Sequence, residues 1–66
     1  MTPAAAFARL FGRPEAVYVL DYLKRITQER TLPPTASNEE LRFLEGQRAL
    51  VACMLSLIKQ GQEKGD

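Results

Sequence analysis

The most strongly patterned stretch of the chain runs from residue 37 to residue 60 and predicts one long helix. At its start, Ser37 precedes Glu40 by three residues, a capping-box pattern in which the two side chains satisfy free amides at a helix start. Downstream, apolar residues recur at helical spacing as far as Ile58. The stretch therefore has both a start signal and the period of a helix.

The apolar residues of this helix form two stripes. The first stripe consists of Leu41, Leu44, Val51, Ala52, Leu55 and Ile58. The second stripe lies about 120° away around the helix. It consists of Phe43, Leu50, Met54 and Leu57. Because one face of a helix cannot hold both stripes, we expect this helix to be covered on most sides.

Two shorter helices are predicted ahead of it, over residues 3–11 and 14–28. Each has a proline in its first turn, where the missing N–H costs nothing, and Gly12 lies between them. The first carries Phe7 and Phe11 one turn apart, and it is too short to persist unless these rings dock on the other helices. The second is amphipathic, with an apolar face formed by Ala16, Val19, Leu20, Leu23 and Ile26.

The remaining segments do not favour regular structure. Pro33 and Pro34 prevent a helix directly before Ser37, so we expect a short connection there rather than a domain boundary. Residues 61–66 contain two glycines and no apolar side chain, and we expect them to fray. The sequence thus predicts a single all-α domain over residues 1–66, ordered from about residue 3 to 60, with a short, a medium and a long C-terminal helix.

The length of the long helix predicts that the chain does not function as an isolated monomer. A helix over residues 37–60 is about 36 Å long, whereas a compact globule of 66 residues is about 28 Å across. The helix should therefore overhang, and the two shorter helices can hardly cover its second stripe. We expect the second stripe to bind a partner, either another copy of the chain or a different protein. Its residues are Phe43, Leu50, Met54 and Leu57.

Two residues of the long helix are expected to have structural roles. Gly46 lies in its interior, where glycine costs roughly 1 kcal/mol relative to alanine, so we expect another helix to pack closely there. The Phe7 and Phe11 rings are candidates for this contact, and a kink or a ligand contact is the alternative. Arg48 falls on the first stripe and is expected to form an ion pair that fixes the second helix on the third, the alternative being a partner-binding arginine. The candidate carboxylates are Asp21, Glu45 and Glu15.

The sequence offers little material for a catalytic or metal site. Cys53 is the single cysteine, and the chain has no histidine to activate it or to complete a zinc site. Because Cys53 lies among Ala52, Met54 and Leu55, we expect a buried and unreactive thiol. We therefore expect no enzymatic activity, no cofactor and no bound metal.

Charge and hydropathy argue against nucleic-acid and membrane partners. A formal net charge of +1 lacks the positive excess that drives binding to nucleic acid, and Asp21 and Glu29 interrupt any basic face on the second helix. The longest apolar run is shorter than the 18 or more residues of a membrane span. We expect a soluble protein in a reducing compartment.

Three groups of residues stand out in order along the chain. They are Phe7 and Phe11 ahead of Gly12, the Val19–Leu20 pair with Leu23, and Glu45-Gly46-Gln47-Arg48 followed by an apolar helix. In this order the chain, from about residue 7 to 59, resembles a family of short proteins of tailed bacteriophages typified by one from a Bordetella phage. The resemblance implies a helical protein of the kind met among virion and head–tail genes, with no known catalytic activity.

Two functions from different classes follow from this resemblance. The protein is either a virion or head–tail assembly component that docks through its long helix, or a phage regulator that binds and inhibits a host protein. Both functions would use the second stripe, and the presence of the protein in purified virions would distinguish them. We expect it in the host cytoplasm during infection or in the virion, as a homo-oligomer or bound to another phage or host protein.

Overall fold

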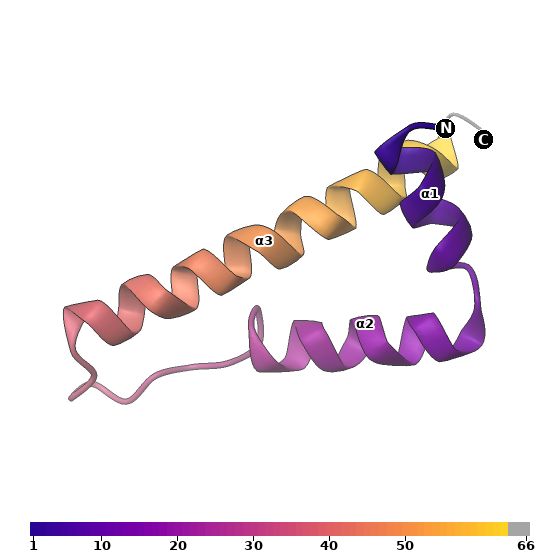
Figure 1. The fold of residues 1–66 in the computed structure, drawn as a ribbon. Coiled ribbons are helices and arrows are strands. Elements are labelled where there is room, and N and C mark those ends of the chain that lie inside the picture. The colour runs from indigo at the N-terminus through magenta and orange to yellow at the C-terminus, as the bar shows by residue number, and fades with distance from the viewer. Residues whose placement is uncertain (64–66) are drawn as a thin grey trace.

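Three α-helices joined by irregular connections make up the computed structural model, which describes residues 1–63 (Figure 1). Helix α1 spans Pro3–Leu10, α2 spans Pro14–Ile26 and α3 spans Asn38–Glu63. These residues contain no strand, which confirms the all-α prediction. The largest difference from the predicted boundaries is at the C-terminal end of α3.

Local side chains determine where the helices begin. Pro3 occupies the first turn of α1, and the Thr2 hydroxyl accepts a hydrogen bond from the Ala5 amide at 3.1 Å. At the start of α3, the Ser37 hydroxyl accepts one from the Glu40 amide at 3.1 Å, so the predicted serine cap is present. Each cap satisfies an amide that has no partner within its helix.

Helix α2 ends at Ile26, shortly before the predicted boundary, because Thr27 leaves the helical conformation (φ −123°, ψ −75°). The Thr27 hydroxyl donates a hydrogen bond to the Leu23 carbonyl at 2.6 Å, and the Glu29 amide donates one to the Lys24 carbonyl at 3.0 Å. Side chains such as threonine can bond nearby backbone groups and so compete with continuation of a helix. These bonds close a turn that redirects the chain into the connection to α3.

Helix α3 forms the long axis of the molecule, and α1 crosses its C-terminal end (Figure 1). Helix α2 runs below α3 in this view, and the connection after it leads back to the start of α3. The molecule measures 45 × 21 × 14 Å and has a Cα radius of gyration of 14.1 Å, against about 11 Å for a compact chain of this length. The elongated shape agrees with the expected overhang of α3.

The core of the described residues is a narrow row along α3. Leu44, Val51 and Ile58, spaced seven residues apart, are only 2 %, 5 % and 8 % exposed, and Ala5 of α1 is buried as well. All three α3 residues belong to the first predicted stripe. The rest of that stripe is less buried: Leu55 is half-buried, and Leu41 and Ala52 are exposed.

The apolar face of α2 is covered only in part. Leu20 and Leu23 are half-buried, but Val19 and Ile26 are 49 % and 39 % exposed, and α2 contains no fully buried residue. Tyr18, outside that face, is 76 % exposed. A helix without buried side chains gains little from packing, so α2 contributes least to the core.

The C-terminal end of α3 corrects the prediction that the tail frays from residue 61. The helix continues to Glu63, and Gly61 is buried against α1. A Cβ atom on Gly61 would lie 2.6 Å from the Ala8 Cβ and would collide with the Ala4 carbonyl oxygen. The glycine therefore permits the close approach of α1 that holds this end of α3 in place. Residues 64–66 lie outside the described part of the chain.

The prediction that another helix packs closely on Gly46 is wrong for the single chain. Gly46 is exposed, and a Cβ atom added there would meet nothing within 4 Å. The Phe7 and Phe11 rings instead stack on each other, with centroids 5.9 Å apart and planes inclined by 9°. The tight helix contact occurs at Gly61, about four turns further along α3.

Candidate partner-binding surface

The four residues predicted to bind a partner differ in exposure along α3. Phe43 and Leu50 are 70 % and 64 % exposed, whereas Met54 and Leu57 are half-buried. Exposure is greatest in the part of the stripe that is remote from the crossing with α1 (Figure 1). The structure thus leaves two large apolar side chains of this stripe in water.

Two small residues share this side of α3. At 100° per residue, positions 43, 46, 50 and 53 fall within an arc of about 80°. All four positions are exposed. We call them the 43–53 face, which consists of Phe43, Gly46, Leu50 and Cys53.

The position of Cys53 corrects the prediction of a buried thiol. Cys53 is exposed, although its neighbours in sequence are apolar. It follows the buried Val51 by two residues, which turns its side chain about 200° around the helix and away from the core row. Whether a helical residue is buried depends on its angular position around the helix, not on the residues next to it in sequence. That position places Cys53 on the solvent-exposed side of α3.

Arg48 lies on the opposite side of α3 and ties this helix to the end of α2. Its Nε atom donates to the Thr27 carbonyl at 2.8 Å, and its Nη2 atom donates to the Arg30 carbonyl. Its Nη1 atom pairs with the Glu45 carboxylate at 2.7 Å. In return, the Gln28 side-chain amide donates to the Arg48 carbonyl at 2.9 Å.

The Arg48 contacts differ in part from those expected. Glu45 is one of the three candidate carboxylates, but the link to α2 runs through backbone carbonyls rather than through Asp21 or Glu15. These two carbonyls belong to the turn that follows α2, in which the Thr27 carbonyl also accepts a hydrogen bond from the Arg30 amide at 3.3 Å. One guanidinium, with five donors, can satisfy several such acceptors at once. No side-chain pattern in the sequence marks these acceptors.

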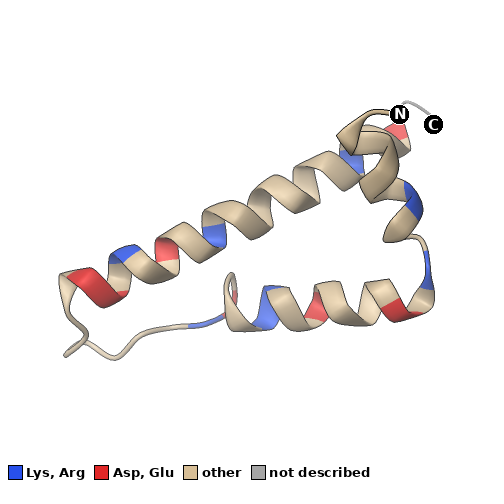
Figure 2. Ribbon diagram, viewed as in Figure 1, with Lys and Arg blue, Asp and Glu red and all other residues tan. Residues whose placement is uncertain are grey.

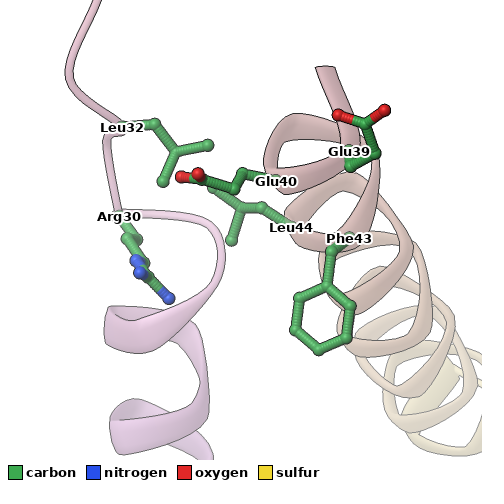
Figure 3. Close-up of a pocket in the computed structure, with 6 residues that line it drawn as sticks. All are labelled: Arg30, Leu32, Glu39, Glu40, Phe43 and Leu44. Atoms are coloured by element: carbon green, nitrogen blue, oxygen red, sulfur yellow. The ribbon is translucent and has the colours of Figure 1, made fainter. Parts of the chain in front are cut away.

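A shallow pocket lies beside this junction, between the connection after α2 and the first turns of α3 (Figure 3). Its volume is about 330 Å³. Leu32 points toward α3 from the connection, and the Phe43 side chain projects from α3. The pocket is lined by Arg30, Leu32, Glu39, Glu40, Phe43 and Leu44. Phe43 therefore belongs both to the 43–53 face and to the lining of this pocket.

Charges of both signs are scattered over the helices, and no basic cluster dominates the view in Figure 2. Helix α3 is uncharged between Arg48 and Lys59. Within residues 1–63, no group of three or more His, Cys, Asp or Glu side chains is placed to hold a metal ion.

The helices of residues 1–63 include none with the length and apolar character needed to cross a membrane.

These features define a class: a small, elongated, three-helix protein whose longest helix has an uncovered apolar side. Residues 7–62 match the family described as Bbp19-like phage protein. Since this match covers most of the chain, the protein belongs to that family, as the resemblance in its sequence predicted. No curated protein and no solved structure matches the chain.

Proposed function

We propose that this phage protein acts by protein–protein contact as a structural or assembly component of the virion or its head–tail junction. It docks through the 43–53 face, with Met54 and Leu57 at the edge of the contact. The observation that carries the proposal is the exposure of Phe43 and Leu50, each with about two-thirds of its surface in water on the same side of α3.

Covering these two side chains would stabilise a complex substantially. Complete burial of a leucine or phenylalanine side chain is worth roughly 1.5–3 kcal/mol. None of the four residues of the 43–53 face is charged, so covering these four residues does not desolvate an unpaired charge. Depletion of charge and the presence of an aromatic residue are typical of the centre of a protein interface.

A lasting assembly suits this surface better than a transient complex. Interfaces of obligate complexes are more apolar than those of transient ones, because their surfaces are not exposed to water for long. A regulator that acted as a single chain would have to stay dispersed with Phe43 and Leu50 uncovered, and exposed apolar patches favour aggregation. A phage particle provides permanent neighbours that would cover them. Membership of a phage family agrees with such a setting.

Mass spectrometry of purified particles of the phage that encodes this chain tests the proposal. We expect the protein in wild-type particles in a fixed ratio to the major structural proteins. Leu50→Glu should deplete it from particles, because a charge at the centre of the face cannot be buried without a partner. Ala52→Glu, a charge at an exposed position on another side of α3, should not. Absence from wild-type particles, with stable capture of a host protein by the chain, would replace the proposal with the host-directed regulator.

A further inference from the structure

We propose that the 43–53 face pairs with the same face of a second copy of the chain, the two α3 helices lying antiparallel. This inference rests on the proposed function and deepens it, because it identifies the neighbour that covers the 43–53 face in the assembly as a second copy of the chain. The pair would be a two-fold symmetric dimer in which both copies contribute the same residues.

The face is complementary to itself when one copy is reversed. Large and small side chains alternate along it, with Phe43 and Leu50 large and Gly46 and Cys53 small. In an antiparallel pair centred at the level of Arg48, Phe43 of one copy lies opposite Cys53 of the other, and Leu50 lies opposite Gly46. Each large side chain then enters a gap left by a small one, as in the packing of coiled coils.

The pairing accounts for Gly46, which the single chain does not explain. Glycine weakens a helix interior relative to alanine, and nothing within the chain lies within 4 Å of the position a Cβ would occupy. In the dimer, the Leu50 side chain of the second copy needs that space. A larger residue at position 46 would hold the two helices apart.

The surface area of the chain is consistent with one missing neighbour. Its accessible surface is 5101 Å², whereas a compact protein of 7.4 kDa exposes about 4200 Å². The excess of about 900 Å² is similar to the roughly 800 Å² that each partner contributes to a standard interface. The elongated chain therefore has enough surplus surface to supply one side of a standard interface.

The antiparallel direction follows from the residues at the edge of the face. Glu39 falls on the same side of α3, so a parallel pair would bring two Glu39 carboxylates together and would set Gly46 against Gly46. The reversed arrangement avoids both contacts and opposes the helix dipoles. Arg48, which holds the end of α2, lies on the far side of α3 and leaves the face free.

The mass of the full chain in solution, measured by light scattering at increasing concentration, tests the pairing. We expect a dimer for the wild type and for Ala52→Leu, which adds the same bulk at an exposed position away from the face. Gly46→Leu should retain its helical circular dichroism spectrum but raise the dimer dissociation constant roughly tenfold or more. A monomeric wild type, or a Gly46→Leu variant that dimerises as tightly as the wild type, would overturn the pairing.

Disulfide trapping tests the direction of the helices. Cys53 is the only cysteine, and in the antiparallel dimer the two copies of it lie about 15 Å apart along the helix axis. Phe43→Cys would place a new thiol opposite Cys53 of the second copy, so diamide oxidation should link the variant at 43–53 and leave the wild type unlinked. Rapid linkage of wild-type Cys53 to itself would show a parallel pair instead. A dimer that is absent from virions would refute only the proposed function, and a monomer present in virions would refute only the pairing.

Discussion

At the scale of single residues, two glycines of α3 have opposite surroundings. Gly46 faces open space, whereas Gly61 lies against Ala4 and Ala8 of α1. The same substitution should therefore have opposite effects at the two positions. Helix propensity dominates where the space is empty, and steric overlap dominates where another helix is in contact.

Gly61→Ala should lower the free energy of unfolding by about 1–3 kcal/mol, because the new methyl group forces α1 away from α3. Gly46→Ala should raise it by up to about 1 kcal/mol through helix propensity. Urea titrations followed by circular dichroism, at concentrations where the chain is monomeric, measure both values. If both substitutions changed the free energy of unfolding in the same direction, the surroundings assigned to the two glycines would be contradicted.

Arg48→Ala should destabilise the chain more than a typical surface substitution does. The variant loses donors to the Thr27 and Arg30 carbonyls as well as the pair with Glu45, and the Arg48 side chain is only 28 % exposed. We expect a loss of about 1–3 kcal/mol. Arg42→Ala, which removes the same charge from an exposed residue of the same helix, is the control and should change stability by less than about 0.5 kcal/mol. Similar losses in the two variants would mean that the carbonyl contacts contribute little.

At the scale of elements, the starts of the helices were predictable and their ends were less so. Thr2-Pro3, Pro14 and Ser37 are local signals, and the helices begin at or beside them. The end of α3 depends on the docking of α1 at Gly61, a contact between distant parts of the chain that no local signal indicates. Long-range packing therefore sets the C-terminal boundary of α3, which the sequence pattern did not predict.

The same distinction applies to the candidate surface. The helical period alone placed Phe43 and Leu50 on a stripe apart from the core row, and both are exposed. The same period also places Cys53 on a different side of the helix from Val51, but the apolar neighbours of Cys53 in the sequence suggested that it would be buried. The acceptors of Arg48, the Thr27 and Arg30 carbonyls in the turn after α2, could not be inferred, because backbone carbonyls are present at every residue.

Helix α2 should be the least protected of the three helices in hydrogen exchange. It has no buried residue, whereas the row from Leu44 to Ile58 anchors α3 and Ala5 anchors α1. Amides in elements with little buried apolar surface exchange through low-energy local openings. Exchange followed by NMR should show faster loss of protons in α2 than in the middle of α3. Equal protection of the two helices would indicate that α2 packs more firmly than its exposure suggests.

At the scale of the whole molecule, the elongated shape links stability to association. A chain of 45 × 21 × 14 Å with a core one row wide has few internal contacts to stabilise it. Burial of the 43–53 face in a dimer would add to that core. Stability should then depend on protein concentration, since association stabilises the folded state by mass action.

The melting temperature of the wild type should rise by roughly 5 °C or more for a hundredfold increase in concentration. The Leu50→Glu variant should melt at one temperature throughout, because it cannot bury the face. Differential scanning fluorimetry over this range, with Ala52→Glu as the control that keeps the dependence, measures the effect. A concentration-independent wild type would indicate that the chain folds without a partner.

The contact between α1 and Gly61 also has a kinetic consequence. It joins the first helix to the last described turn of α3, so nearly the whole chain must be closed into a loop before α1 can dock. Helix α3, whose internal bonds are all local, can form well before that closure. Docking of α1 is then a late step in folding, and Gly61→Ala should accelerate unfolding while leaving the folding rate almost unchanged.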